Sequence, residues 1–203
     1  MDEQRTEEWF AARLGKVTAS RVADVIAKTK TGYAATRETY MTQLVLERLT
    51  NTKAESFTSA AMQWGIDQEV FARGFYEAQT GKLVQEVGFI PHPRIDMAGA
   101  SPDGLIDDDG MLEIKCPDSK QMVETLLTQK IPQRYIAQMQ FQMACAERSY
   151  CDYVVFDPRM PPKVQLFVKR VERDNQFIAE MEGEIVKFLS EVQSQVQQLN
   201  AII

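Results

Sequence analysis

Residues 101–117, with the sequence SPDGLIDDDGMLEIKCP, decide the fold of this chain. The run Asp107-Asp108-Asp109-Gly110 predicts a hairpin turn, because Asp and Gly tolerate the positive φ angles that such turns require. The segments on its two sides, 96–106 and 111–116, are short and bounded by Pro, Gly and Asp, which is typical of strands. The stretch therefore predicts two strands that lie side by side.

Two carboxylates and one ammonium group are expected to meet on this hairpin. Asp103 and Glu113 come close across the strand pair, and Lys115 projects from the same face as Glu113 because the two are two residues apart. Ile114 points the other way into the core, but its backbone carbonyl stays near both carboxylates. Such oxygen ligands suit Mg²⁺ or Mn²⁺. A divalent cation lowers the pKa of the water that it binds, which phosphodiester hydrolysis requires.

The residues alone leave a second interpretation open. Acids in a hairpin turn are solubilising features in most proteins. A lysine on a strand between Leu, Ile and Cys is different, because burying its charge is costly without a carboxylate partner. Asp103, Glu113 and Lys115 are therefore equally consistent with a catalytic centre and with a purely structural role.

The remaining patterns predict a helical start, a sheet and a long final helix. Before residue 81, helices are predicted from a cap at Thr6 to a stop near Gly15, from a cap at Ser20, over 36–49, and over 59–80. Beyond it, strands are predicted over 83–90, 96–106, 111–116, 150–156 and 164–171, and helices over 119–127, 133–146 and 175–199. This order indicates an α/β fold with a central mixed sheet flanked by helices. We expect one domain over 1–203, with a helical part over 1–80, a sheet core over 82–171 and a C-terminal helix over 174–203.

Two local patterns carry expectations about burial. Trp64, Phe71 and Phe75 recur at helical spacing, which predicts one buried stripe. His92 stands between two prolines in a predicted turn, which favours an exposed position.

The charges of the chain are unevenly spread. The net charge is −6, yet residues 13–37 hold six bases and one acid, whereas residues 172–203 hold six acids and two bases. This split predicts a basic face that can hold phosphates, opposite an acidic exterior. An ordinary solvated helix surface explains the same counts, so net charge alone decides nothing about a nucleic-acid partner.

Composition and cysteine usage indicate the class of protein. The hydrophobic content of 44% and the charged content of 26% are ordinary for a globular protein. No apolar run approaches the roughly 18 residues of a membrane span, so no membrane partner is expected. The acidic, polar start is unlike a signal peptide, and Cys116, Cys145 and Cys151 lack zinc-type spacing. We therefore expect reduced thiols and a cytoplasmic location.

Pro102-Asp103, followed after nine residues by Glu113-Ile114-Lys115, resembles the signature of the PD-(D/E)xK nuclease superfamily. The surrounding sequence resembles one branch of it, the phage lambda exonuclease and related YqaJ-type viral alkaline exonucleases. The resemblance implies a restriction-endonuclease-like fold. It is carried by seven motifs in order: Trp9 with Arg13-Leu14-Gly15, Thr18-Ala19-Ser20, Trp64-Gly65 with Glu69, Ser101-Pro102-Asp103-Gly104, Glu113-Ile114-Lys115-Cys116-Pro117, Tyr135 with Gln138, and Asp157-Pro158-Arg159-Met160.

The resemblance implies a role for each residue of the signature. Asp103, Glu113 and the carbonyl of Ile114 would bind Mg²⁺ or Mn²⁺, and Lys115 would position or activate the attacking water. Glu69 would assist a second metal position, so that one or two ions clamp the attacking and leaving oxygens. Gln138 would approach the scissile bond. Judged on residue type alone, Glu69 is a solvated helix residue and Gln138 is as well explained as a structural amide.

The resemblance also implies contacts with DNA. Arg13, Ser20 and Ser101 would form a pocket for a 5′-phosphate, where arginine offers a bidentate fork and a helix N-terminus favours an anion. The alternative is that Arg13 complements a helix dipole and that Ser20 is only a cap. Four further residues would contact DNA, namely Tyr135 on the face of Gln138, and Lys28, Lys30 and Arg37 along the backbone. Met62 would be an apolar wedge at the terminal base pair.

The expected function is that of a Mg²⁺-dependent exonuclease. It would digest one strand of linear duplex DNA from its 5′-phosphorylated end and leave a 3′ overhang for single-strand annealing recombination. The resemblance further implies a homotrimeric ring, a phage-type annealing protein as partner, and a phage or prophage origin in a bacterial host. Two alternatives stay open, a structure-specific or restriction-type endonuclease and a catalytically inactive nuclease-fold DNA binder.

Overall fold

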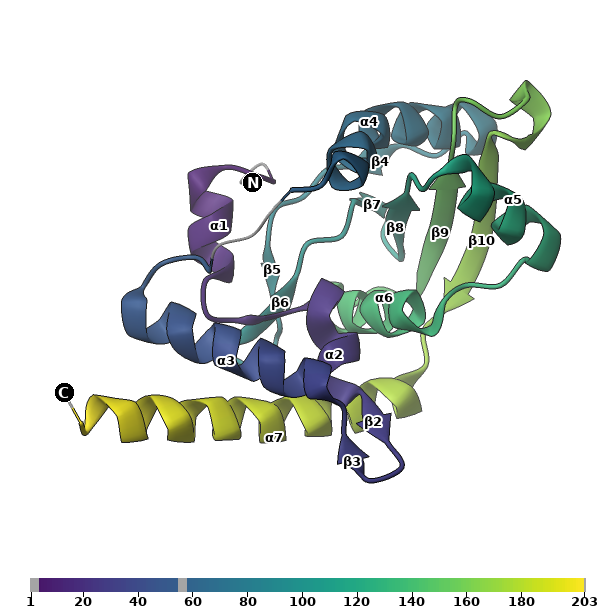
Figure 1. Ribbon diagram of the computed structural model, residues 1–203. Coiled ribbons are helices and arrows are strands. Elements are labelled where there is room, and N and C mark those ends of the chain that lie inside the picture. Colours follow the sequence, from purple (N-terminus) through teal and green to yellow (C-terminus); the bar gives the residue numbers. More distant parts are fainter. Residues whose placement is uncertain (1–3, 55–57, 203) are drawn as a thin grey trace.

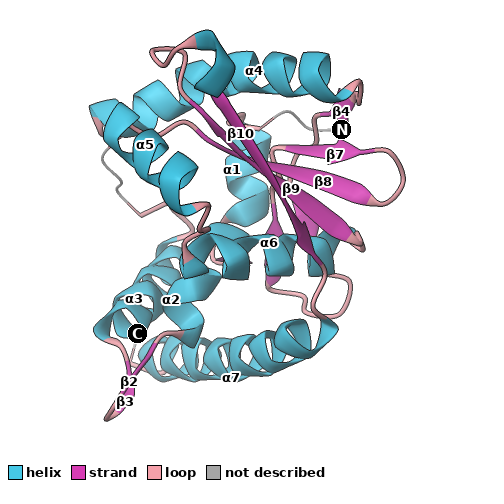
Figure 2. Ribbon diagram, turned by 90° about the vertical axis from the view of Figure 1, so that its right-hand side faces the viewer, coloured by secondary structure: helices cyan, strands magenta, loops and turns pink. Residues whose placement is uncertain are grey.

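The central sheet has five strands in the order β10-β9-β8-β7-β4. Their bounds are β4 Val84–Gln85, β7 Gly104–Ile106, β8 Gly110–Lys115, β9 Tyr150–Phe156 and β10 Leu166–Glu172. β8 and β9 run parallel and the other neighbours antiparallel, so the sheet is mixed, as expected. The computed structural model describes residues 4–54 and 58–202, and Figure 2 shows helices on both sides of this sheet.

The predicted hairpin between β7 and β8 is confirmed. Gly104 pairs with Leu112, and the Asp103 amide donates to the Leu112 carbonyl at 3.1 Å. Asp107 begins the turn with a φ of 47°, a left-handed conformation that Asp tolerates. In this register Asp103 lies beside Glu113, as the sequence predicted.

Alternate residues of β8 face different helices. Leu112 and Ile114 pack in one cluster with Ala72 and Tyr76 of α4 (Ala60–Thr80). Met111 belongs to a methionine-rich cluster with residues of α5 (Ser119–Thr128) and α6 (Gln133–Ala146). Strand alternation places Glu113 and Lys115 on this second face. Ile114 is 6% exposed, so its side chain is buried in the core, as predicted.

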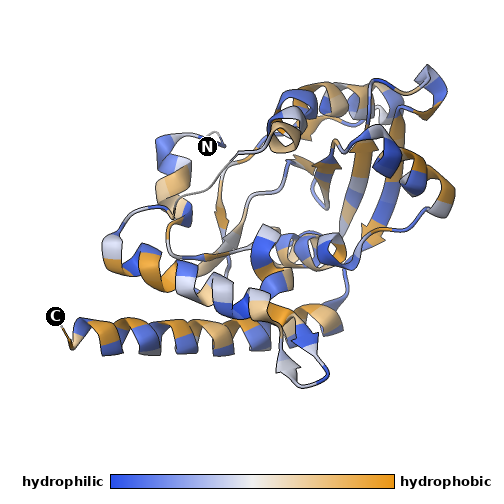
Figure 3. Cartoon of the chain, in the orientation of Figure 1, coloured by the Kyte–Doolittle hydropathy of each residue, from blue (hydrophilic) through white to orange (hydrophobic). Residues whose placement is uncertain are grey.

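A further core lies on the side of α6 that is turned away from the sheet. There α7 (Asn175–Asn200) packs along α2 (Val22–Ile26) and α3 (Ala35–Thr50), as Figure 1 shows. Apolar and polar residues alternate along α7 (Figure 3), and its buried side carries Ile178, Met181, Ile185, Phe188, Val192 and Val196. A small sheet in the order β1-β6-β5 adjoins this core, with β1 Val17–Thr18, β6 Ala98–Ala100 and β5 Ile90–Pro91. The remaining elements are α1 Glu7–Arg13, the 3-10 turns Ala19–Arg21 and Pro162–Val164, and the hairpin of β2 Lys28–Thr29 and β3 Gly32–Tyr33.

Most predicted helix ends are confirmed by their caps. The Thr6 side chain accepts from the Trp9 amide before α1, and Gly81 ends α4 with a φ of 72°. Ser20 is an exception, because helical backbone already begins at Ala19 and Ser20 lies inside that 3-10 turn instead of capping α2. No helix within residues 4–54 and 58–202 is long and apolar enough to cross a membrane.

Two predicted strands are wrong in extent. The segments 83–90 and 96–106 each divide into two short strands that join different sheets. Pro102 lies in the second break, where it has no N–H with which to continue a ladder. Gly99 explains the close pairing of β6 with β5, since an added Cβ would stand 2.2 Å from the Phe89 ring. The short strands β1, β2 and β3 also interrupt a region that we expected to be entirely helical.

The predicted buried stripe on α4 is wrong. Phe71 is 58% exposed and Phe75 is 47% exposed, while Ala72 and Tyr76 are fully buried against the sheet. One residue turns an α-helix by about 100°. The spacing of Trp64, Phe71 and Phe75 therefore identified a stripe but not the side of the helix that meets the sheet.

The predicted separation of a basic face from an acidic exterior is also wrong. The acids of α7 lie directly against the basic N-terminal segment, where Lys28 Nζ is 2.7 Å from Glu184 and Arg37 binds Glu191 at 2.7 and 3.1 Å. Arg37 itself is buried. The apolar faces of α2, α3 and α7 bring these opposite charges together, so they neutralise one another locally.

His92 is buried instead of exposed. Its Nδ1 accepts from the amides of Arg94 and Ile95 at 3.2 and 3.1 Å, and its Nε2 lies 3.0 Å from Glu182 of α7. Because two amides donate to Nδ1, the ring proton belongs on Nε2, which donates to Glu182. The tight turn thus directs the ring inward, where it stacks on Phe141.

Candidate active site

A cleft of about 950 Å³ opens between α1, α4, α6 and the C-terminal end of β8. It collects most of the residues that the sequence analysis singled out, although they come from distant parts of the chain. Those that line it are Arg13, Ser20, Met62, Glu69, Ser101, Asp103, Glu113, Ile114, Lys115, Tyr135 and Gln138. Lys28, Lys30 and Arg37 do not line it.

Asp103, Glu113 and Lys115 converge at the floor of the cleft. Asp103 Oδ2 accepts from the Ile114 amide at 2.7 Å, and Lys115 Nζ forms an ion pair with Glu113. Burial, and then the nearby Glu113 and Glu69, raise the pKa of Asp103 well above its usual range. Burial alone would lower the pKa of Lys115, but Glu113 and Asp103 outweigh it and raise that pKa. The floor therefore holds crowded carboxylates beside a charged ammonium.

Glu113 is held by three donors within the described part of the chain. Lys115 and Gln138 both donate to Oε1, the latter at 2.6 Å, and Gln142 donates to Oε2 at 2.7 Å. Glu113 is 1% exposed, so these contacts offset the cost of burying its charge. Gln142 was not predicted. Its spacing of one helical turn from Gln138 is the signal that could have identified it.

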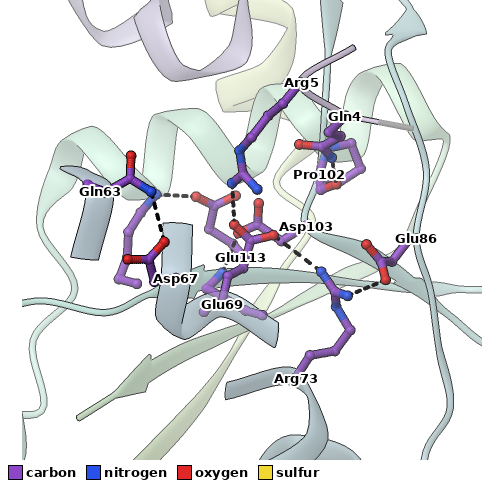
Figure 4. Close-up of polar contacts among 12 residues, drawn as sticks. Gln4, Arg5, Gln63, Asp67, Glu69, Arg73, Glu86, Pro102, Asp103 and Glu113 are labelled. Carbon is purple, nitrogen blue, oxygen red and sulfur yellow. Dashed lines mark hydrogen bonds and ion pairs between the residues drawn. The ribbon is translucent and has the colours of Figure 1, made fainter. Parts of the chain in front are cut away.

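Glu69 reaches the cleft from α4 between two arginines. Arg5 Nη2 lies 2.6 Å from its Oε2, and Arg73 Nη2 lies 3.2 Å from its Oε1. Figure 4 shows the two guanidinium groups approaching Glu69 from different directions, close to Asp103 and Glu113. Gln4 holds the N-terminal segment in place, because its amide donates to the carbonyls of Val87 and Pro102 at 2.9 and 2.8 Å.

The arginine before α1 was not predicted as a site residue. Arg5 has a φ of 71°, a left-handed conformation that is uncommon for a side chain of its size. The charge and position of Arg5 in a polar N-terminal segment gave no pattern by which sequence analysis could place it beside Glu69. Only the tertiary structure shows that contact.

The residues on the floor of the cleft fit a divalent cation with a small protein ligand set. No three His, Cys, Asp or Glu side chains among residues 4–54 and 58–202 lie close enough together to hold a metal by themselves. Mg²⁺, however, commonly binds through one or two carboxylates and keeps several waters. Burial and the neighbouring carboxylates raise the pKa of Asp103 because they disfavour its ionised form, which a bound cation would favour. Asp103, Glu113 and the Ile114 carbonyl suit this role, and Glu69 would first have to leave Arg5.

A second subsite at the cleft wall suits a phosphate. Ser101 Oγ accepts from Trp9 Nε1 at 2.9 Å and from Arg13 Nη1 at 3.0 Å, which leaves its hydroxyl hydrogen free to donate. Burial lowers the pKa of Arg13 to about 10, so the guanidinium stays positive at neutral pH. Arg13 forms no ion pair with the described residues, and Ser20 is exposed on the same cleft. A partly buried cation beside two hydroxyl groups is suited to an anionic ligand.

Aromatic and basic side chains from several elements also line the cleft. Lys115 Nζ lies 4.8 Å from the ring centroid of Tyr135, and the guanidinium of Arg134 lies 4.6 Å from it. Arg159 stacks over Trp64 at 4.4 Å and is held by Asp157. In the sequence, Arg159 belongs to one of the seven motifs of the resemblance, but no specific role was expected for it. Cys116 also lines the cleft, and it, Cys145 and Cys151 are free.

Two comparisons, with family models and with solved structures, relate this chain to known proteins. The YqaJ-like viral recombinase domain matches residues 8–149. An alkaline exonuclease (LHK-Exo) from Laribacter hongkongensis is 50% identical, covers 97% of both chains and has a TM-score of 0.91. The same exonuclease in complex with dAMP is 51% identical with the same coverage and TM-score. A phage related exonuclease from Haemophilus somnus 129PT is 13% identical, covers 91% of this chain and 96% of its own, and has a TM-score of 0.71, which shows the fold alone.

A comparison with curated proteins finds no match. The predicted resemblance, the restriction-endonuclease-like fold and the enzyme class, an exonuclease, are confirmed by the family match and by the similarity to LHK-Exo.

Proposed function

Because the chain belongs to the YqaJ-like viral recombinase domain family and is an exonuclease, we propose that it degrades one strand of linear double-stranded DNA in the 5′-to-3′ direction. The reaction depends on Mg²⁺, starts at a 5′-phosphorylated end and leaves a 3′ overhang for single-strand annealing recombination. The observation that carries the proposal is the convergence of Asp103, Glu113 and Lys115 at the floor of a cleft whose wall holds the Arg13–Ser101 subsite.

The closeness of the phosphate subsite to the floor of the cleft supports the 5′-to-3′ polarity. Ser101, on the phosphate subsite, lies two residues before Asp103, on the catalytic floor. A 5′-phosphate bound by Arg13, Ser20 and Ser101 therefore directs the adjoining phosphodiester of the same strand toward Asp103. The similar exonuclease was crystallised with dAMP, a nucleoside monophosphate, which agrees with mononucleotide products.

Asp103, Glu113 and the Ile114 carbonyl would hold the first ion, Mg²⁺ or Mn²⁺, and Glu69 would assist a second one. When bound, the ion supplies Lewis-acid stabilisation of charge on the phosphate and acidifies water. Lys115 carries a positive charge beside this point, where it orients the attacking water and stabilises the developing negative charge. Gln138, which donates to Glu113 in this structure, would turn toward the scissile bond, and Tyr135 would border the nucleotide beside it.

Contacts farther along the duplex are proposed for the basic N-terminal segment. Lys28, Lys30 and Arg37 would meet the DNA backbone, although Lys28 and Arg37 must first exchange their partners on α7. Met62, which is 56% exposed at the edge of the cleft, would be the apolar wedge at the terminal base pair. On the same family resemblance we propose a single domain over 1–203, a homotrimeric ring, a phage-type annealing partner and a cytoplasmic location in a bacterial host.

Strand polarity is tested with two linear duplexes of identical sequence, one with 5′-phosphate and one with 5′-hydroxyl ends. Each strand is labelled at its 3′ end in separate samples. A 5′-to-3′ exonuclease shortens the labelled strand progressively, whereas a 3′-to-5′ enzyme releases the label at once. Digestion should be faster from the 5′-phosphate, and Arg13→Gln should remove this preference. Immediate release of the 3′ label would overturn the polarity.

The two alternative functions are tested with three further samples. Covalently closed circular duplex should survive, whereas an endonuclease would nick it. Excess chelator should stop digestion of linear duplex. The Asp103→Asn variant should no longer digest DNA but should still bind it. If the protein were a DNA binder without nuclease activity, the wild type would not digest DNA either.

A further inference from the structure

Gln142 is a polar residue in an unusual place. It is 0% exposed on α6, where the neighbouring buried residues Phe141 and Met143 are apolar. Burying an amide is costly unless its donor and acceptor are both satisfied. An apolar residue could fill the same space if packing were the only role of this side chain. The hydrogen bonds of Gln142 therefore indicate its role.

Its donor is directed at Glu113. Gln138 and Gln142, one helical turn apart, reach the two oxygens of that carboxylate separately, with Gln138 at Oε1 and Gln142 at Oε2. Lys115 also binds Oε1. An ionised carboxylate offers about four lone-pair sites, two on each oxygen. Oε1 therefore has both of its sites occupied, and Oε2 keeps one.

The acceptor of Gln142 has no partner. Its Oε1 is buried and makes no hydrogen bond with the described residues. The amide cannot be reversed to relieve this, because its oxygen would then face the Glu113 carboxylate. The fold bears this unsatisfied group while it keeps the contact to Oε2.

The three donors also differ in their freedom to move. Lys115 and Gln138 are partly exposed to the cleft and can turn toward bound DNA. Gln142 is 0% exposed, and among the described residues its amide donates only to Glu113. It is therefore the contact that persists when substrate replaces the other two.

We propose that Gln142 is a positioning residue that fixes the rotation of the Glu113 carboxylate, so that Oε2 offers its single free lone pair to the divalent cation. This inference rests on the proposed metal-dependent function. Groups that orient a metal ligand without touching the metal typically contribute 10- to 100-fold to metal affinity or activity. Gln142 is expected to contribute within this range.

Two substitutions separate hydrogen bonding from packing. Gln142→Met keeps the volume and removes the donor. Gln142→Ala leaves space in which a water molecule can donate to Glu113 Oε2. If Gln142 acts as a donor, the metal affinity of the Ala variant exceeds that of the Met variant. A packing role predicts the reverse, because Ala creates a cavity and Met does not.

Gln140 on the same helix supplies a matched control. It is 2% exposed, and its amide binds the Glu172 carbonyl and the Asp174 amide, both at 2.8 Å, away from the cleft. Gln140→Met removes two satisfied hydrogen bonds, so it should lower the unfolding temperature more than Gln142→Met. It should leave metal affinity unchanged.

The measurement is calorimetric titration of Mn²⁺ and Mg²⁺ into the DNA-free protein, with thermal unfolding recorded for each variant. We expect Gln142→Met to weaken Mn²⁺ binding by about 10- to 100-fold, Gln142→Ala to weaken it less, and Gln140→Met not to change it. Equal affinities in wild type and folded Gln142→Met would overturn the inference, as would weaker binding by Ala than by Met. If Gln142→Met does not fold, the Gln142→Ala variant tests the role. The role would be refuted if this variant bound Mn²⁺ as tightly as wild type while its crystal structure showed no buried water beside Glu113.

Failure of the proposed function gives a different result. In that case the wild-type protein binds neither ion, or Asp103→Asn binds as tightly as wild type. Loss of the Gln142 effect alone, with wild-type binding that depends on Asp103, refutes only the positioning role.

Discussion

Removal of one buried hydroxyl, by Tyr76→Phe, should destabilise the fold without touching the active site. The Tyr76 ring is fully buried between α4 and the sheet, and its hydroxyl donates to Asp152 Oδ2 at 2.7 Å. Burial and then Asp152 raise the pKa of Tyr76, so the phenol remains a donor throughout the working pH range. The substitution leaves the ring packing unchanged and removes only this donor.

The expected loss follows from the partners that remain. Asp152 is 4% exposed and keeps two contacts with Arg170, at 2.8 and 3.0 Å. A hydrogen bond to a charged group contributes about 1.5–3 kcal/mol. Because Arg170 still balances the charge, we expect the lower part of this range, about 1.5–2 kcal/mol. For a chain of this size, that corresponds to a fall of roughly 3–8 °C in the unfolding temperature.

Urea unfolding followed by circular dichroism measures this loss as a shift of the midpoint at constant m-value. Tyr33→Phe is the matched control, since the Tyr33 hydroxyl also binds a carboxylate, Glu184, at 2.6 Å but at a less buried site. Water can replace that phenol, so the control should lose less stability. Mn²⁺ affinity should be unchanged in both variants. Equal losses in the two variants, or no loss in Tyr76→Phe, would refute the reasoning.

Three further perturbations test the site and its surroundings. Lys115→Ala should reduce the rate of digestion by about 10²–10⁴-fold, the range for a group that assists proton transfer or charge stabilisation; a single-turnover assay that shows a near-normal rate would contradict its role. Arg5→Gln frees Glu69 from a partly exposed ion pair, and such pairs contribute about 0.2–1 kcal/mol. We therefore expect Mn²⁺ binding to tighten by up to about fivefold, with Arg94→Gln, remote from the cleft, as an unchanged control. Burial, partly offset by Glu182, lowers the pKa of His92 from 6.5 in the folded protein. As the pH falls, the imidazole therefore takes up a proton in the unfolded chain before it does so in the folded protein. The stability that His92 contributes above pH 6.5 should be lost as the pH falls through its folded pKa. Urea midpoints at pH 7.5, 6.0 and 5.0 measure this loss, and a His92→Gln variant with the same pH dependence as wild type would show that another group is responsible.

The sequence predicted those parts of the fold that depend on local chemistry. The Asp-rich turn fixed the register of β7 and β8, and caps such as Thr6 and Gly81 marked helix ends, because turn and cap residues act on backbone within a few positions. The same local rule placed Glu113 and Lys115 on one face of a strand. Burial was predicted less well, since the side of α4 that meets the sheet depends on what packs there, and His92 turned inward to satisfy two amides of its own turn.

The sequence by itself determined which side chains meet at the floor of the cleft, because two acids and a lysine at this spacing on a hairpin lie close together wherever the rest of the chain goes. Only the tertiary structure decided what surrounds them. Arg5 meets Glu69 across 64 positions, and Gln142 meets Glu113 across 29. It likewise decided that acids of α7 pair with Lys28 and Arg37. Contacts of this kind arise when apolar faces pack and carry their polar neighbours with them, and no periodicity in the chain records which faces will meet.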